Sequence, residues 1–143
     1  MTRTVDIDFT FKSAVEPSSV VGRLVSSGMT ADVGGKISYL LDLDGMFDWG
    51  NADSSELDQV ISLMGDRRWG DGHVGITLLF AGSTRGGDLL FQPGRTVVSF
   101  SITVNPKYLQ NSSKFCDLGW YLAALIPLFE PLGLTEVEAR DVP

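Results

Sequence analysis

Cysteine and histidine are almost absent from this sequence, which contains only Cys116 and His73. A single cysteine cannot form an intrachain disulfide, and a free thiol inside an apolar segment is typical of a reducing cytosol. The common zinc sites need several cysteine or histidine ligands, so this chain alone cannot build one. Cysteine–histidine catalysis would have to use this one pair, and we expect Cys116 to be buried. These scarcities predict a cytoplasmic protein that needs no cofactor.

Basic residues and long apolar runs are also scarce. Only 11 Lys and Arg stand against 18 Asp and Glu, and the net charge is −7. General nucleic-acid binding needs basic patches that displace counterions from phosphates, so we expect no direct contact with nucleic acid. The N-terminus, MTRTVDIDF, lacks the apolar run of a signal peptide, and no segment is long enough to span a bilayer. An acidic surface does favour encounter with a basic protein partner.

Several catalytic motifs are missing as well. No glycine-rich stretch is followed by Gly-Lys-Ser/Thr, no GxGxxG joins a strand to a helix, and no GxSxG forms an esterase elbow. His73 begins a predicted strand next to glycines, and we interpret it as an ordinary surface or turn histidine. The sequence therefore contains no complete catalytic set.

What the sequence does contain is a clear alternation of strands and helices. At 143 residues with 43% hydrophobic content, it predicts one domain over residues 1–143. Period-two alternation predicts strands, and 3.6-residue periodicity with capping residues predicts helices that begin near Glu16 and Asp53. The predicted strands span residues 3–12, 36–43, 73–81, 88–92, 95–104 and 135–140, and a third helix covers the apolar run 118–129.

This order predicts an α+β domain. A mostly antiparallel sheet of five or six strands would carry helices on one face. The other face would be largely exposed, because the polar positions of each strand fall on it. They are Asp6, Asp8, Thr77, Ser99, Ser101, Thr103, Glu136 and Glu138.

The run 118–129 contains no charged residue. A helix that is apolar all round is usually buried all round, so we predict a central core helix lying on the sheet. A helix that binds a partner or a membrane surface is the alternative. Pro127 lacks a backbone donor and should kink or stop this helix.

The most distinctive polar stretch runs from Asp42 to Gln59, where six acids occur with Phe47 and Trp49 between them. Tryptophan is enriched at interface hot spots, and carboxylates on a rigid domain could occupy the phosphate sites of a basic enzyme such as a nuclease. We therefore interpret the chain as a non-enzymatic protein-binding module, such as a small acidic inhibitor or immunity protein that neutralises a basic toxin or enzyme. The candidate partner-binding residues are Asp44, Asp48, Trp49, Asp53, Glu56 and Trp69.

Other functions remain open at this stage. The stretch Asp42-Leu43-Asp44-Gly45 after an apolar strand resembles the first motif of haloacid-dehalogenase-type phosphatases. That resemblance implies a magnesium-dependent enzyme with Asp42 as nucleophile and Asp44 as general acid/base. The sequence departs from the motif at Met46, where the family usually has threonine or valine. An irregular calcium site at the same acids and a role as a subunit of a larger assembly are further alternatives.

Overall fold

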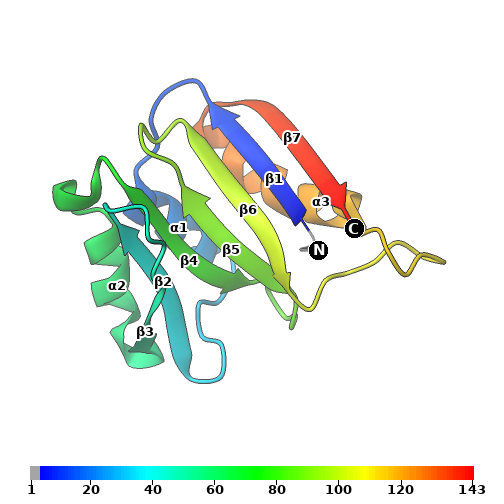
Figure 1. Ribbon diagram of the computed structural model, residues 1–143, viewed down its shortest axis with the longest axis horizontal. Helices are drawn as coiled ribbons and strands as arrows, with labels where there is room; N and C mark the ends of the chain where they lie inside the picture. Colours follow the sequence, from blue (N-terminus) through cyan, green and yellow to red (C-terminus); the bar gives the residue numbers. More distant parts are fainter. Residues whose placement is uncertain (1–3) are drawn as a thin grey trace.

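The computed structural model describes residues 4–143, which form one seven-stranded antiparallel sheet with three α-helices on one face (Figure 1). The strands lie in the order β3-β2-β4-β5-β6-β1-β7. The strands are β1 (Thr4–Phe11), β2 (Lys36–Asp42), β3 (Gly50–Asp53), β4 (His73–Leu79), β5 (Gly86–Phe91), β6 (Val97–Val104) and β7 (Leu134–Val142). The helices are α1 (Pro17–Ser26), α2 (Leu57–Met64) and α3 (Leu118–Phe129), with short 3-10 turns η1 (Ser54–Glu56), η2 (Arg67–Trp69) and η3 (Glu130–Leu132). The predicted α+β class is confirmed, with one strand more than the upper predicted number.

The predicted alternation of β1 is confirmed. Ile7, Phe9 and Phe11 point into the core and are at most 3% exposed. The strand lies between β6 and β7 and pairs antiparallel with both. Arg3, with which we predicted this strand to begin, lies outside the described residues.

The additional strand is β3, which forms the edge of the sheet beside β2. Its sequence GNAD has no apolar alternation, so the pattern predicted only a loop followed by a helix at Asp53. Asp53 does act as a cap, because its Oδ1 accepts a hydrogen bond from Ser55 N at 3.0 Å. It caps the 3-10 turn η1, and the α-helix begins only at Leu57. The helix predicted to begin near Asp53 therefore begins as a 3-10 turn and becomes an α-helix only one turn later.

Helix α1 begins with an acidic cap. The Glu16 carboxylate accepts hydrogen bonds from Ser18 N at 3.2 Å and from Ser19 N at 2.7 Å. Partial burial would raise the pKa of Glu16, but these bonds to Ser18 and Ser19 outweigh it and hold the pKa below the ordinary value. The helix buries Val20, Val21 and Leu24 against the sheet, as its apolar stripe predicts.

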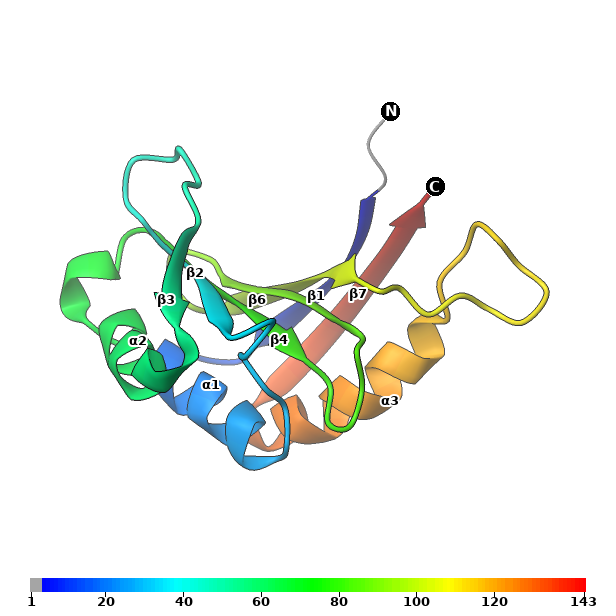
Figure 2. The same cartoon turned by 90° about the horizontal axis from the view of Figure 1, so that it is seen from below.

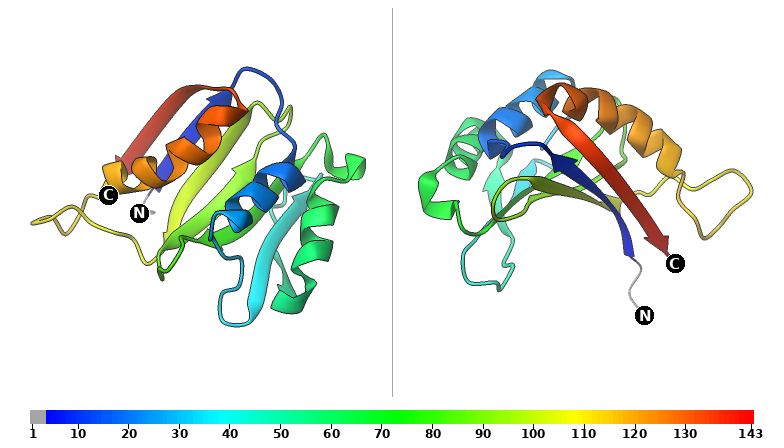
Figure 3. Two further views of the ribbon diagram at one scale, coloured as in Figure 1. Left: turned by 180° about the vertical axis from the view of Figure 1, so that it is seen from behind. Right: turned by 90° about the horizontal axis from the view of Figure 1, so that it is seen from above.

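Helix α3 is not buried all round, which corrects the sequence interpretation. Tyr121, Leu125 and Phe129 repeat every four residues and form its one fully buried face. Figure 3 shows that α3 runs over the half of the sheet that contains β1, β6 and β7, while α1 and α2 cover the other half. Because a sheet contacts only one side of such a helix, the opposite side, with Ala123 and Pro127, is exposed.

The helix also continues through Pro127 for two residues, so of the predicted kink or stop at this residue the stop is wrong. Because proline has no backbone N–H, the carbonyl of Ala123, four residues earlier, receives no helical hydrogen bond. Both residues are exposed, so water can bind that carbonyl and the helix tolerates the proline.

The sheet is curved, and its helix-free face is concave (Figures 2 and 3). The β2–β3 loop rises on one side of this face, and the ends of β1 and β7 rise on the other (Figure 2). We call the helix-free surface the open face. It is the surface on which the candidate site lies.

Candidate protein-binding site

The strand registers arrange the side chains of the open face in rows that cross the sheet. One row runs from Arg140 on β7 through Asp6 and Ser101 to Asp88 and Thr77 on β4. The next row, two residues along each strand, consists of Glu138, Asp8, Ser99, Leu90, Gly75 and Leu40. The rows are therefore acidic toward β7 and apolar toward β2.

A chain of hydrogen bonds links these rows across the sheet. Ser99 Oγ donates to Asp8 Oδ1 at 2.6 Å and accepts from Gln92 Nε2 at 3.2 Å. His73 Nε2 lies 3.0 Å from Gln92 Oε1. An amide oxygen can only accept a hydrogen bond, so His73 Nε2 carries the hydrogen in this pair. Arg140 Nη2 extends the chain through ion pairs, because it lies 4.0 Å from Asp8 Oδ2 and 3.2 Å from Asp6 Oδ1 in the other row. The polar side chains of the open face are thus held in fixed positions.

The row that contains Asp6 borders a depression of about 320 Å³ on the open face. Asp88 lies on its far side, and Thr77 Oγ1 donates to Asp88 Oδ1 at 2.6 Å. Hydrogen bonding to Asp6 and the charge of Asp6 raise the pKa of Arg140, which keeps this cation firmly charged. The carboxylates of Asp6 and Asp88 therefore flank one shallow hollow in the middle of the acidic half.

The β2–β3 loop, residues 43–49, exposes an unusual density of large apolar side chains. The exposed fraction is 55% for Leu43, 68% for Met46, 42% for Phe47 and 37% for Trp49. Monomeric proteins rarely leave such contiguous apolar side chains uncovered unless they serve an interaction. The loop therefore carries four of the ten large hydrophobic side chains that are exposed within residues 4–143.

Two aspartates hold the loop in shape. Asp42, at the end of β2, accepts hydrogen bonds from Gly45 N at 3.2 Å and from Phe47 N at 3.1 Å. Asp44 Oδ1 accepts from Met46 N at 3.0 Å, and this bond lowers the pKa of Asp44. The conformation includes a positive φ of 54° at Phe47, which the hydrogen bond from its own N–H to Asp42 helps to hold. The apolar side chains are thus presented by a fixed loop.

Trp49 folds from the loop onto the open face. A Cβ atom placed on Gly75 would lie 2.9 Å from Trp49 Cη2 and 3.2 Å from Leu90 Cδ1, so the glycine leaves the space that the indole occupies. Leu40, beside Gly75 in the neighbouring strand, is fully buried although it points to the open side. We call Leu40, Trp49 and Leu90 the apolar shelf.

The structure brings only some of the predicted site residues together. Asp44, Asp48 and Trp49 share the exposed β2–β3 loop. Asp53 and Glu56 follow at the end of β3 and the start of α2, where both are exposed.

Trp69 belongs to another part of the fold. It is half-buried in η2 and packs against the core, and its carbonyl accepts a 2.6 Å hydrogen bond from Arg95 Nη2. Its indole Nε1 is buried without a hydrogen-bond partner. Trp69 therefore packs between the core and the connection formed by residues 65–72. Of the two tryptophans among the candidate partner-binding residues, only Trp49 lies in the exposed β2–β3 loop.

The residues expected for phosphatase chemistry have other tasks in this fold. Asp42 is only 4% exposed, and both of its oxygens accept backbone hydrogen bonds from the loop. The strand that carries Asp42 pairs antiparallel with both of its neighbours in the sheet. No group of three or more histidine, cysteine, aspartate and glutamate side chains within residues 4–143 is arranged to hold a metal ion.

The sequence predicted that Asp6, Asp8, Glu136 and Glu138 share the exposed face of the sheet, but it did not predict which of the polar side chains on this face contact one another. Asp8 and Ser99 are 91 residues apart and Asp6 and Arg140 are 134 apart, so nothing local connects them. Asp88 was assigned to a short strand without a role. The alternation of β1 and β6 was the one signal that these side chains share a face.

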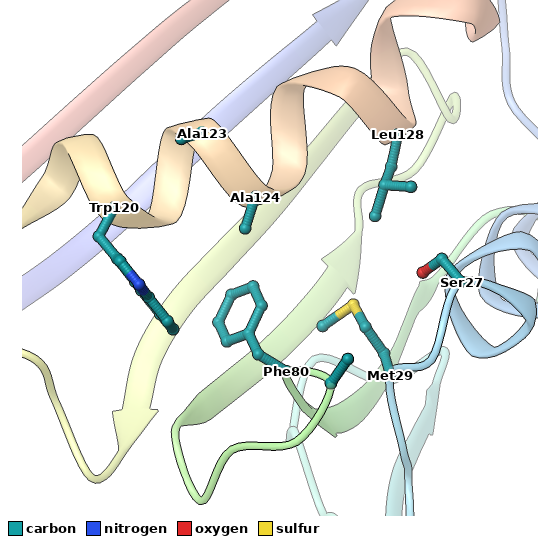
Figure 4. Close-up of a pocket in the computed structure, with 8 residues that line it drawn as sticks. Ser27, Met29, Phe80, Trp120, Ala123, Ala124 and Leu128 are labelled. Carbon is teal, nitrogen blue, oxygen red and sulfur yellow. The ribbon is translucent and has the colours of Figure 1, made fainter.

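A second hollow lies on the helix side of the sheet. It has a volume of about 440 Å³ and lies between α3 and the segment that follows α1, with Phe80 between them (Figure 4). Trp120, Ala124 and Leu128 line it from α3, and Met29 lines it from the other side (Figure 4). None of the residues that line it is charged. Its chemistry therefore differs from that of the open face.

Among residues 4–143, none of the helices has the length and apolarity needed to cross a membrane. Comparisons of the chain with protein-family models, with curated proteins and with solved structures find no match.

Proposed function

We propose that this protein is a non-enzymatic protein-binding module, a small acidic inhibitor of the immunity-protein kind that acts in the cytoplasm on a basic enzyme or toxin. The observation that carries the proposal is the β2–β3 loop. It holds Met46 and Phe47 between Asp44 and Asp48, and Trp49 directly after Asp48, with all three apolar side chains exposed on a loop fixed by hydrogen bonds.

Both components of the loop suit a protein interface. A fixed aromatic side chain contributes contact area at small entropic cost, because little side-chain freedom is lost on binding. Carboxylates around it attract a basic partner over distance and speed the encounter. The net charge of −7 extends that attraction to the whole molecule. A basic active site that normally holds phosphate groups offers the complementary surface.

The test begins with capture of binding proteins from lysates of the source cells and of neighbouring strains. A captured basic enzyme is then assayed with and without an equimolar amount of this protein. We expect its activity to be lost, and we expect the affinity to fall steeply as salt is raised, because the attraction between exposed charges is screened. Calorimetry at low and high ionic strength measures the second effect.

Variants of the loop sharpen the test. Trp49→Ala should weaken the complex by about 2 kcal/mol, as expected for an interface hot spot, or roughly 30-fold in Kd. Asp44→Asn combined with Asp48→Asn should mainly slow association. Asp58→Asn removes an exposed carboxylate on α2 and is the matched control, which should leave both quantities nearly unchanged. Full inhibition by Trp49→Ala, or an affinity that does not depend on salt, would overturn the proposal.

A further inference from the structure

We infer that the partner docks across the whole open face, with an apolar side chain on the apolar shelf and arginine or lysine side chains on the carboxylates of Asp6, Asp8 and Asp88. This inference rests on the proposed function for its choice of a protein as partner. It adds a binding surface that extends from the β2–β3 loop to β7.

The charges of the open face specify the acidic half of this surface. Strands β1, β5 and β7 bring five carboxylates to it and one cation, Arg140, which is already paired with Asp6. The carboxylates are those of Asp6, Asp8, Asp88, Glu136 and Glu138. At the opposite edge of the sheet, Lys36 on β2 lies across from Asp53 on β3. Hydrogen bonds from Ser55 lower the pKa of the Asp53 carboxyl most, and the charge of Lys36 lowers it further. The excess of negative charge is therefore concentrated toward β7.

The positions of Asp6 and Asp88 suit a cationic side chain between them. Both lie opposite Ser101 of β6, one in each neighbouring strand, so two strand spacings of about 4.8 Å each separate their backbones. The 320 Å³ depression lies between them. A guanidinium or ammonium group placed there is within reach of both carboxylates, and guanidinium binds carboxylates with two parallel hydrogen bonds.

The apolar shelf supplies the second contact. Trp49 covers Gly75 in the same row as Asp8 and Ser99, so the apolar and acidic halves lie on one continuous concave surface (Figure 2). The hydrogen bonds of Ser99 and Gln92 keep the polar groups between the halves in place before binding. A partner surface with an apolar residue beside basic residues matches this order.

The same charges argue against a second copy of this chain as the occupant. Docking two open faces would place carboxylates of one copy against those of the other, and like charges in close contact repel. The second hollow, which Trp120 lines on the helix side, has no charged residue in its lining and cannot attract a basic partner in this way. A basic, heterologous protein surface is the occupant that the charge distribution selects.

The test uses isotope-labelled protein and a short synthetic peptide of alternating arginine and leucine residues as the probe. Two control peptides replace arginine by glutamate or leucine by serine. We expect the arginine–leucine peptide to shift the amide resonances of β1, β5 and β6 and the indole N–H resonance of Trp49. The glutamate peptide should shift none of them, and the serine peptide should shift the acidic half without Trp49.

Matched variants separate a defined surface from general charge attraction. Asp6→Asn with Asp88→Asn removes two charges from the open face, and the amide oxygens can still accept from Arg140 and Thr77. Asp58→Asn with Glu130→Gln removes two exposed charges elsewhere. We expect the first pair to weaken peptide binding about tenfold and the second pair to change it less than about twofold. Equal effects of the two pairs, shifts centred on Trp120, or no shifts would overturn the inference.

The same variants distinguish this inference from the proposed function. If Trp49→Ala abolishes inhibition of the captured enzyme while Asp6→Asn with Asp88→Asn inhibits fully, the function stands and docking across the open face is wrong. If the peptide binds the open face but no enzyme is inhibited, the surface stands and the inhibitor function is wrong.

Discussion

The two faces of the sheet are built from the same seven strands, yet their side chains have different roles. On the helix side, Ile7, Phe9 and Phe100 are fully buried beneath helices. On the open side, the alternate residues of the same strands form a hydrogen-bonded polar array with one apolar shelf at its edge. The helix side supplies apolar burial, which dominates folding free energy, whereas the open side arranges chemical groups for contact with another molecule. Substitutions on the two faces should therefore have different consequences.

The largest effect is expected on the helix side. Phe129 is fully buried, and its ring lies 4.7 Å from that of Phe9 and 5.7 Å from that of Phe11, measured between centroids. Phe129→Ala should lower the free energy of unfolding by about 3–5 kcal/mol, because it removes apolar contacts and leaves a cavity. Denaturant titration measures the change. Phe115→Ala, at a residue that is 46% exposed, should change it by less than about 0.5 kcal/mol. Similar losses in the two variants would contradict the assignment of the core.

A smaller effect is expected where the open face meets the loop. Gly75→Ala places a Cβ 2.9 Å from Trp49 Cη2 and 3.0 Å from the Leu89 carbonyl oxygen. Overpacking of this kind should lower stability by about 1–3 kcal/mol and displace the indole, which changes its N–H resonance. Gly22→Ala is the control, because nothing lies within 4 Å of its Cβ and alanine favours the helix interior. It should raise stability, and a gain at both glycines would show that Trp49 does not cover Gly75.

The smallest effect is expected within the polar array. Ser99→Ala removes the hydroxyl that joins Asp8 to Gln92 and should lower stability by about 1 kcal/mol. Thr103→Ala changes an exposed residue on the same strand and face and should have little effect. The comparison of thermal unfolding between the two variants measures what the buried hydrogen bonds contribute. A loss of stability as large as that of Phe129→Ala would mean that the polar array contributes as much to the folding free energy as the buried core does.

Most of the fold could be predicted because its signals are local. Alternation identified β1 and β6, and the capping residues Glu16 and Asp53 marked where α1 and the turn before α2 begin. Strand β3 was missed because three of its four residues, Gly50, Asn51 and Asp53, carry no apolar signal and only its pairing with β2 defines it. The apolar composition of α3 overstated its burial, because composition does not reveal that one side of the helix has no neighbour.

The candidate site was predictable only in part for a related reason. Residues 42–49 form one loop, so their chemistry is visible in a single stretch of sequence. Trp69 resembles Trp49 in sequence context, since acidic residues lie near both in segments predicted as loops, but Trp69 packs against the core. The pairing of Asp6 with Asp88 around Ser101 depends on the strand order, which sequence alone left open.

The position of β1 has a consequence for the order of events during synthesis. The first strand made pairs with β6 and with β7, so Thr4 ends opposite Val142 and Asp6 opposite Ser101. Loop closure over so many residues is slow, and contacts of high sequence separation form late. While the chain emerges from the ribosome, β1 stays unpaired at both edges until β6 is made, and β7 can join it only after residues 134–142 have been translated. The apolar face of β1 is then the segment most in need of a chaperone, so premature aggregation of truncated nascent chains should begin there.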